Sequence, residues 1–409
     1  MAGMANGRYV KPERSNLIPL PEGSELFSLP DRLPVGTDPD NGEPLLLDKD
    51  PNNPNNRISA VAAFMAPAYT AIYNTAYQTQ ENPVLLPLFA YTAVGWHDGR
   101  FWVSGFRSDP DIRQDYGYFN QSKINRKTRK KLRKFPTNKL IQHLGTCCLI
   151  YHCPAARNFF LDRWEAPLPT SPVCNARCVG CISLQPSGCC PSTQNRIQFV
   201  PSVREIAEIA IPHLNNADYP IVSYGQGCEG EPLMQGELLE QSILFIRKKT
   251  AKGVINLNSN ASRPEVVDRL ASAGLDSIRV SMNSAQKQYY HRYYRPTHYT
   301  FADVESSIKT MKAHGKFVSL NYFILPGFSD SIPETDALCT LVERSKPDFI
   351  QLRNLNMDPE WYLRTLKLPK TEKALGIRKW LALLKKRFPA LKFGYFNPFL
   401  QQNKPVPIL

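Results

Sequence analysis

The sequence predicts an α/β fold built around an open, curved parallel sheet with helices on its outer face. From about residue 163, six short apolar runs alternate with six segments of helical periodicity, and such alternation is typical of right-handed β–α–β units. Each predicted strand also carries polar side chains on one face and Val, Ile or Leu on the other, because residues two apart share a face. Since closed barrels pack branched apolar side chains at their centre, the polar face predicts a sheet that stays open around a polar cavity.

The individual elements follow from local signals in chain order. The first strand is expected within residues 163–170, and Ser202 with Glu205 has the capping-box spacing that opens a helix to about residue 215. Pro264 marks the first turn of another helix, and the stretch between 282 and 301 is expected to be irregular. The other strands are expected at 221–224, 254–258, 278–282, 317–324 and 349–354, and the other helices at 236–249, 301–314, 333–344 and 377–388.

The residues before this sheet are expected to form an N-terminal α+β extension. Residues 1–57 are rich in the turn formers Pro, Asn and Asp, which predicts an extended or partly disordered arm. Residues 58–162 are expected to hold a helix at 58–80, a hairpin at 88–106 that turns at His97-Asp98-Gly99, and a basic segment. The sheet domain is assigned to 163–395, and a C-terminal tail to 396–409.

Composition limits the class of protein. With 409 residues, of which 42% are hydrophobic and 11% aromatic, the chain can bury a core, so wholesale disorder is excluded. The most apolar run, 84–96, is too short to span a membrane and contains Pro87, and the first residues lack the apolar core of a secretory signal. We therefore expect a soluble, cytoplasmic protein without membrane contact. In that compartment ten cysteines favour metal or redox chemistry over disulfides.

Three cysteines carry the strongest functional signal. Cys174, Cys178 and Cys181 have the spacing C-x₃-C-x₂-C directly after the first predicted strand. Three thiolates on one loop can hold three irons of a cubane iron–sulfur cluster and leave the fourth iron open for chemistry. The alternative is a zinc loop that takes its fourth ligand from elsewhere.

Other polar segments follow the later strands. They are 225–232 after the second strand, 258–260 and 281–283 at the ends of the third and fourth, and 326–328 after the fifth. Because the carboxyl ends of parallel strands lie at one edge, these segments and the cysteine loop are expected to share one rim.

Over residues 163–355 this arrangement resembles that of the radical S-adenosylmethionine (SAM) enzymes. The resemblance implies a partial (β/α)6 TIM-like barrel, a 4Fe-4S cluster on the three cysteines, and SAM bound at the open iron. It places Pro326-Gly327 on the adenine side, whereas Gly180 departs from the family, which often has an aromatic residue before the third cysteine. The residues that it assigns to the cofactor are Gly230, Glu231 and Pro232 near the methionine amino group, Asn258, Ser281 and Asn283 near sugar hydroxyls, and Arg279 near a carboxylate.

The resemblance also implies the chemistry. The reduced cluster cleaves SAM to methionine and a 5′-deoxyadenosyl radical, which removes a hydrogen atom from a substrate. Such an enzyme needs a one-electron reductant such as flavodoxin or ferredoxin. The substrate stays open: RNA or another anionic macromolecule, a peptide or protein that is modified or activated, and a small molecule are all consistent with the sequence. From another class, a zinc-stabilised nucleic-acid-binding protein without catalysis is the alternative.

The charge pattern bears on the substrate. The net charge is +14, and the segment from Lys123 to Lys139 holds nine basic residues and no acidic one. Such a segment can bind phosphates, including those of RNA. It can equally be the solvated face of a helix that docks through the residues at helical spacing, Ile124, Thr128, Leu132 and Phe135.

The remaining cysteines form a second group. Cys147, Cys148 and Cys153 lie close to His143 and His152 along the chain, and Cys189 and Cys190 follow the cluster loop. They can hold a second cluster or a zinc ion, or they can be buried as apolar side chains. Cys228 and Cys339 are expected to be packed.

Overall fold

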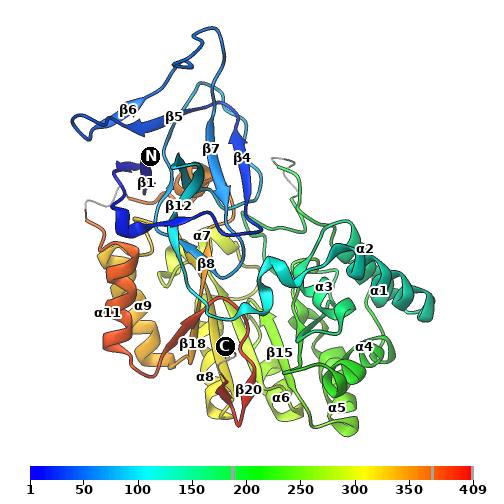
Figure 1. Ribbon diagram of the computed structural model, residues 1–409. Helices are drawn as coiled ribbons and strands as arrows, with labels where there is room; N and C mark the ends of the chain where they lie inside the picture. The colour runs from blue at the N-terminus through cyan, green and yellow to red at the C-terminus, as the bar shows by residue number, and fades with distance from the viewer. Residues whose placement is uncertain (186–187, 189, 370–372, 407–409) are drawn as a thin grey trace.

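The computed structural model describes residues 1–185, 188, 190–369 and 373–406. Its centre is a parallel sheet of seven strands in the order β13-β14-β15-β16-β17-β18-β19, open between β13 and β19 (Figure 1). This confirms the predicted α/β partial barrel, and β19 adds a short seventh strand. The strands are β13 Glu165–Leu168, β14 Ile221–Tyr224, β15 Val254–Ser259, β16 Ser277–Met282, β17 Phe317–Ile324, β18 Phe349–Asn354 and β19 Lys392–Gly394.

Helices cover the outer face of this sheet, where the largest apolar cluster of the protein lies. The helices predicted from periodicity are α4 Val203–Asn216, α5 Gly236–Lys249, α6 Pro264–Ala273, α8 Phe301–Ala313, α9 Ile332–Ser345 and α11 Ile377–Arg387. Two further helices, α7 Lys287–Tyr294 and α10 Pro359–Leu366, were not predicted. The stretch expected to be irregular is therefore partly helical: α7 buries Tyr289, Tyr290, Tyr293 and Tyr294 on one face, and that spacing is helical.

The inner face of the sheet is polar, as predicted. Asn256 Nδ2 donates to Ser223 Oγ at 3.2 Å, and Ser277 Oγ donates to Asn256 Oδ1 at 2.8 Å, so side chains of three neighbouring strands are linked. At the amino-terminal end of the strands the interior is closed by an apolar cluster that includes Trp164, Phe396 and Leu400. The segment that follows β19 therefore forms the floor of the barrel and ends in the hairpin β20 Leu400–Gln401 and β21 Lys404–Pro405. Residues 407–409 of the predicted tail lie outside the described residues.

The N-terminal 107 residues form antiparallel sheets rather than the predicted arm and helix. The hairpin is confirmed as β11 and β12, which pair from Val94 opposite Val103 to His97 opposite Arg100. The strands are β1 Gly3–Ala5, β2 Arg8–Val10, β3 Leu17–Pro19, β4 Glu25–Leu29, β5 Arg32–Thr37, β6 Pro44–Leu46, β7 Ala60–Phe64, β8 Tyr69–Ala71, β9 Asn74–Thr75, β10 Tyr77–Thr79, β11 Thr92–His97 and β12 Arg100–Arg107.

Two expectations for this region are wrong for one physical reason. Residues 1–57 are not a partly disordered arm, because β4 pairs with β7, β1 with β9 and β5 with β10. Residues 58–80 are not helical, because Ala62 and Ala63 are fully buried on β7 between β4 and β11. Pairing with strands that are distant in sequence overrides local propensity in both segments.

The N-terminal sheets lie against the carboxyl-terminal rim of the barrel near β17 and β18 (Figure 1). Asn354 Nδ2 donates to Tyr69 O at 3.0 Å, and its Oδ1 accepts from Ala71 N at 2.8 Å. On the same side Arg32 forms a fully buried ion pair with Asp358, at 2.9 Å. This part of the rim is therefore covered by the N-terminal region.

Three helices form a layer beside α4 (Figure 1). They are α1 Gln121–Lys134, α2 Lys139–Leu149 and α3 Pro154–Leu161. Ile124 and Thr128 of α1 are fully buried, so the basic segment is a docked helix whose charged face points outward. Across the described ranges no helix is long and apolar enough to cross a bilayer.

Candidate active site

The cysteine loop follows β13 and is held by backbone hydrogen bonds from two elements. On one side, Gly230 N donates to Ser171 O at 2.7 Å and Glu231 N donates to Val173 O at 2.8 Å. On the other side, Arg177 N and Val179 N donate to the carbonyls of Tyr294 and Tyr293 at 2.9 and 3.0 Å. The loop is thus clamped between the turn after β14 and the end of α7.

The three thiols of the loop share one electrostatic environment. Burial, followed by the charge of Glu231, raises the pKa of Cys174 to about 12. Burial and the thiolates of Cys174 and Cys181 raise the pKa of Cys178 well above its usual value. Among the described residues, the cationic side chain that contacts these sulfurs is Arg196, which donates to Cys181 Sγ at 3.4 Å. Bound metal ions would relieve this mutual repulsion of thiolates.

The spread of the three sulfurs distinguishes a cluster from a single ion. Among the described residues, one set of three ligand atoms lies within 4.8 Å of one another, and it is formed by His143, Cys147 and Cys228. The sulfurs of Cys174, Cys178 and Cys181 do not form such a compact set. A single zinc ion requires ligand atoms about 4 Å apart or less, whereas a cubane spreads its thiolates over separate irons. The loop therefore fits a cluster better than it fits zinc.

Two buried carboxylates organise the turn after β14. Glu231 Oε1 accepts from Ser259 Oγ at 2.6 Å and from Leu233 N at 3.0 Å, and its Oε2 accepts from Asn260 N at 2.9 Å. Burial raises its pKa to about 7. Its carboxylate therefore joins the turn to the end of β15. The contact of Gly230, Glu231 and Pro232 with SAM stays a prediction.

The second carboxylate, Glu229, was missed by sequence reasoning. Its Oε2 accepts from the backbone amides of Thr170 and Ser171 at 2.7 and 2.9 Å, and its Oε1 accepts from Gln226 N at 2.6 Å. Burial raises its pKa to about 7. Glu229 therefore ties the end of β13, where the cysteine loop begins, to the turn after β14. Its place two residues before Glu231 was the only signal for it in the sequence.

Two glycines permit this close approach of backbone segments. Gly225 has φ of +77°, and a Cβ there would lie 1.7 Å from Asn258 O. A Cβ on Gly230 would lie 2.0 Å from Val173 O, next to Cys174. Any larger residue at either position would separate the cysteine loop, the turn after β14 and the end of β15.

The residues assigned to the sugar and carboxylate differ in their surroundings. Asn258 Nδ2 donates to Gly225 O at 2.9 Å, so this side chain supports the turn. Asn283 Nδ2 donates to Tyr289 O and to the Tyr362 hydroxyl at 3.2 and 3.1 Å, while its Oδ1 is buried without a partner. Ser281 is half-buried. None of these contacts tests the predicted binding of SAM, which stays a prediction.

The interior also holds two arginines without a carboxylate partner. Arg279 donates to Gln351 Oε1 at 3.3 Å, and its Nε is buried without a partner. Burial and the neighbouring charge of Arg353 lower the pKa of Arg279 to about 9. Arg353 donates to Asn321 Oδ1 at 3.2 Å and lies over the ring of Tyr395 at 4.1 Å. Neither guanidinium has a carboxylate within 4.0 Å in the described ranges, so the interior favours a bound anion.

Two further predicted positions are explained by their neighbours. A Cβ on Gly180 would lie 3.0 Å from the Tyr293 hydroxyl and 3.2 Å from Met357 Sδ. Tyr293 of α7 therefore places an aromatic side chain beside position 180, where the cysteine loop itself has only glycine. The Pro326-Gly327 turn contacts the N-terminal strand, because Asn6 N donates to Pro326 O at 2.9 Å.

The second group of cysteines is only partly brought together. Cys148 Sγ lies 3.4 Å from Thr128 Oγ1, and Cys153 is the N-cap residue of α3. Cys190 and Cys339 are buried, and Cys189 lies outside the described residues. His152 lies 2.7 Å from an Arg157 nitrogen at the surface. Cys228 is buried in the core, as predicted, and Cys147 lies beside it and beside His143.

Part of the chain is similar to one known protein family. Residues 168–339 match the family model described as the Radical SAM superfamily. No curated protein matches the chain.

Three solved structures illustrate the similarity. They are anSMEcpe with bound AdoMet (18% identity, TM-score 0.37, 47% of this chain and 52% of that chain), HydG, a maturase of FeFe-hydrogenase (17%, 0.38, 68% and 66%), and Streptococcus suis SuiB bound to precursor peptide SuiA (13%, 0.41, 58% and 52%). The chain thus spans from about half to just under two thirds of the length of these proteins. With TM-scores below 0.5, these likenesses carry no argument.

Proposed function

Because the chain is an enzyme of the radical SAM superfamily, we propose that it cleaves SAM reductively and removes a hydrogen atom from an anionic substrate. A 4Fe-4S cluster together with SAM supplies the electron transfer and the 5′-deoxyadenosyl radical of this chemistry. The observation that carries the proposal is the direct backbone link between the cysteine loop and the Glu231 turn at one rim. The match of residues 168–339 supports an enzyme over a non-catalytic zinc protein.

Each group at the rim then has a defined task. Cys174, Cys178 and Cys181 would hold the 4Fe-4S cluster, which would leave one iron without a protein ligand from this loop. Glu229 and Glu231 act as positioning residues, because their oxygens hold backbone amides of the loop and the turn. The segment Gly230-Glu231-Pro232 would hold the methionine end of SAM. The sugar hydroxyls of SAM would form hydrogen bonds with Asn258, Ser281 and Asn283.

The charge of the interior supports an anionic substrate. Glu165 lies among the inner side chains, where it accepts from Ser223 and Asn397 at 2.7 and 2.9 Å. Two guanidinium groups therefore face one carboxylate, and the excess positive charge is half-buried, which is costly without a partner. If Arg279 binds the carboxylate of SAM, Arg353 is available for an anionic group of the substrate.

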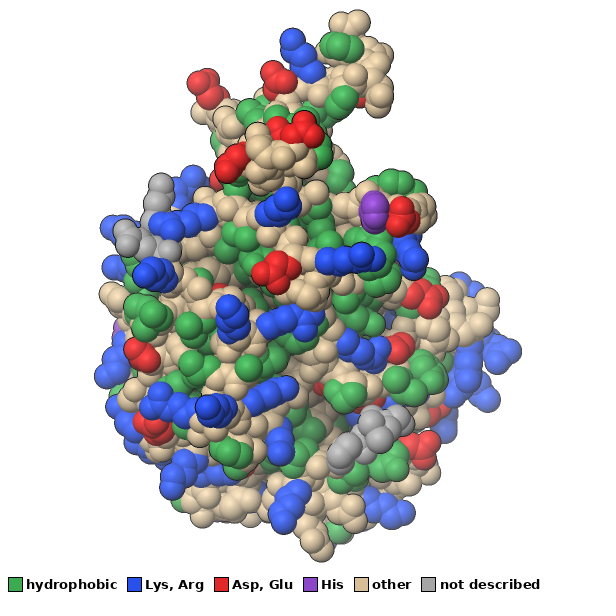
Figure 2. Space-filling view, turned by 60° about the vertical axis from the view of Figure 1, so that its left-hand side comes forward, with side chains coloured by type: hydrophobic (Ala, Val, Ile, Leu, Met, Phe, Trp, Pro, Cys, Tyr) green, Lys and Arg blue, Asp and Glu red, His purple; other side chains and the backbone are tan. Residues whose placement is uncertain are grey.

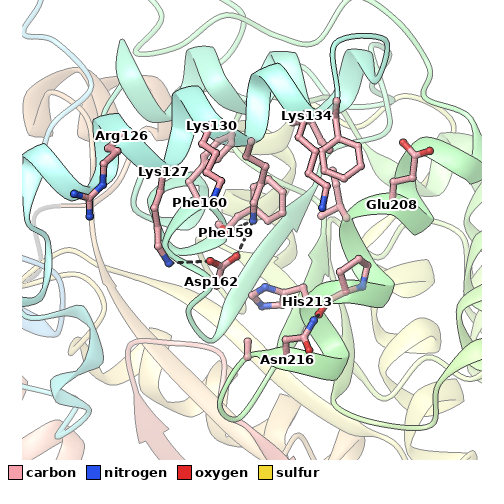
Figure 3. A pocket seen from close by; sticks show the side chains of 16 residues that line it. Arg126, Lys127, Lys130, Lys134, Phe159, Phe160, Asp162, Glu208, His213 and Asn216 are labelled. Atoms are coloured by element: carbon pink, nitrogen blue, oxygen red, sulfur yellow. Dashed lines mark hydrogen bonds and ion pairs between the residues drawn. The ribbon is translucent and has the colours of Figure 1, made fainter.

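A groove on the outer surface, beside the amino-terminal ends of β13 and β14 and away from the rim, is consistent with docking of RNA. Basic side chains of α1, Phe159 and Phe160 of α3, and α4 line a groove of about 560 Å³ (Figure 3). Lys127 and Lys131 both bind Asp162, at 2.9 and 2.8 Å.

The rest of the groove's basic side chains are available for phosphates. In the described chain, Arg126, Lys130 and Lys134 form no ion pair with a carboxylate. On the face that Figure 2 brings forward, Lys and Arg also exceed Asp and Glu but are spread over the surface. The groove, rather than the net charge, therefore supports phosphate binding.

The proposed enzyme also needs an electron donor and a compartment that contains one. The chemistry requires a one-electron reductant, for which flavodoxin or ferredoxin is suitable, and we place the enzyme in the cytoplasm with such proteins.

The cleavage of SAM is tested by anaerobic reconstitution of the full chain with iron and sulfide. After addition of SAM and dithionite, 5′-deoxyadenosine is measured by chromatography. Wild-type protein is expected to release it, Cys178→Ala is expected to release none, and the control Cys339→Ser, in helix α9, is expected to match wild type. Colourless protein without iron, or release that survives Cys178→Ala, contradicts the proposal.

The substrate class is tested by the salt dependence of RNA binding. The variant Arg126→Gln/Lys130→Gln/Lys134→Gln is expected to lower the slope of log K against log salt by about 2 to 3. The matched control Lys379→Gln/Lys385→Gln/Lys386→Gln removes three exposed lysines from α11 and is expected to leave the slope unchanged. An unchanged slope in the first variant, or faster 5′-deoxyadenosine release with peptide fractions than with RNA fractions, rejects RNA in favour of another substrate.

A further inference from the structure

A compact set of three metal-binding side chains lies outside the cysteine loop. His143 and Cys147 lie on α2, and Cys228 lies in the turn after β14. His143 Nε2 is 3.6 Å from Cys147 Sγ, and all three ligand atoms lie within 4.8 Å of one another. We propose that His143, Cys147 and Cys228 bind one zinc ion, which joins helix α2 to the turn that contains Glu229 and Glu231.

The sequence and fold explain how these residues meet. His143 and Cys147 are four residues apart on a helix, so they lie on one face. Cys228 is placed by its own backbone, because Ile197 N donates to Cys228 O at 2.8 Å. Cys147 and Cys228 are 1% and 4% exposed, which protects an ion from solvent.

The ligand chemistry selects zinc. One imidazole and two thiolates are a common ligand set for zinc, with bonds of about 2.3 Å to sulfur and about 2.0 Å to nitrogen. In a tetrahedral site these bonds separate a sulfur and a nitrogen by about 3.6 Å, and the Nε2–Sγ distance here is 3.6 Å. Ordinary packing of apolar cysteines explains one buried thiol beside a histidine, but it does not explain three ligand atoms from two distant segments converging on one point.

Cys153 can supply a fourth ligand only if its thiol moves closer, because its sulfur is not among the ligand atoms that lie within 4.8 Å of one another. Its backbone amide donates to Cys147 O at 2.9 Å, and it directly precedes helix α3. A closed set of four protein ligands is typical of structural zinc.

The location gives the site a structural role. The turn 225–231 holds the cysteine loop through Glu229 and Gly230. An ion at Cys228 would fasten this turn to α2, two residues before the Gly230-Glu231 pair. The zinc ion would thus stabilise the iron–sulfur site without taking part in its chemistry.

The test is the metal content of the full chain, purified anaerobically and washed with a chelator. Wild type is expected to retain one zinc per chain, and Cys147→Ser and Cys228→Ser are expected to lower zinc affinity by at least about tenfold. The matched control Cys148→Ser, on the same helix but bonded to Thr128, is expected to keep its zinc. Cys153→Ser is expected to weaken binding as well.

Further measurements separate this proposal from that of the SAM site. The variant Cys174→Ala/Cys178→Ala/Cys181→Ala is expected to lose iron and keep zinc. If the zinc-site variants do not fold, cobalt exchange into wild type is expected to give the intense absorption of thiolate–cobalt charge transfer. Wild type without zinc and without that absorption overturns the proposal. So does extra iron that is lost with Cys147→Ser, or a disulfide between Cys147 and Cys228 in the anaerobic protein.

Discussion

Replacement of Glu229 tests whether a buried carboxylate positions the cysteine loop. Three backbone amides, those of Thr170, Ser171 and Gln226, donate to it at 2.6 to 2.9 Å. Glu229 is 4% exposed, so water cannot readily replace it. In Glu229→Ala all three amides lose their acceptor, and the end of β13 is no longer tied to the turn after β14.

The magnitude follows from these contacts. Each buried donor left unpaired costs about 1 to 3 kcal/mol, so three give an upper range of about 3 to 9 kcal/mol. Relief of the buried charge offsets part of this, since burial already raises the pKa of Glu229 to about 7. We expect Glu229→Ala to lower the free energy of unfolding by about 3 to 5 kcal/mol. Glu229→Gln keeps one acceptor oxygen but turns an amide NH₂ toward a donor. We expect this variant to lower the free energy of unfolding by about 1 to 3 kcal/mol.

The assay combines urea unfolding with iron content after reconstitution. Glu229→Ala is expected to bind markedly less iron than wild type, and Glu229→Gln an intermediate amount. Glu237→Ala is the matched control, because Glu237 is exposed on α5. If Glu229→Ala unfolds at the wild-type urea concentration and binds iron fully, the carboxylate does not position the loop.

Three other changes have expected outcomes. Gly180→Phe forces a side chain against Tyr293 and Met357 and is expected to lower the iron content of the reconstituted protein. Full iron content would show that α7 moves enough to make room for the new ring. Arg32→Met leaves Asp358 buried without its partner and is expected to cost about 3 to 5 kcal/mol, measured by urea unfolding; an unchanged midpoint would contradict this. His213 is buried, which lowers its pKa to about 4, so the folded state binds fewer protons than the unfolded state between about pH 6.5 and pH 4. Stability from neutral His213 is therefore present above pH 6.5 and is lost on acidification. Between pH 7.5 and 5.5 wild type is expected to lose about 1 kcal/mol more than His213→Gln, and equal losses in urea titrations would contradict the assignment.

The sequence by itself determined the sheet domain. The apolar runs at 221–224, 317–324 and 349–354 became β14, β17 and β18 with the predicted bounds. They were predictable because a strand with one apolar face needs apolar residues at a period of two and a helix needs them at a period of 3.6, and both requirements are local. The C-x₃-C-x₂-C spacing was readable for the same reason, since its ligands lie on one short loop.

Only the tertiary structure decided which distant segments meet. The N-terminal strands pair with partners tens of residues away, such as β4 with β7. Glu229 is important because Thr170 and Ser171 lie beside it in space, and Cys228 meets Cys147 across 81 positions of chain. Burial and hydrogen bonding between remote segments depend on how the whole chain packs. Local propensity and residue spacing do not predict that packing.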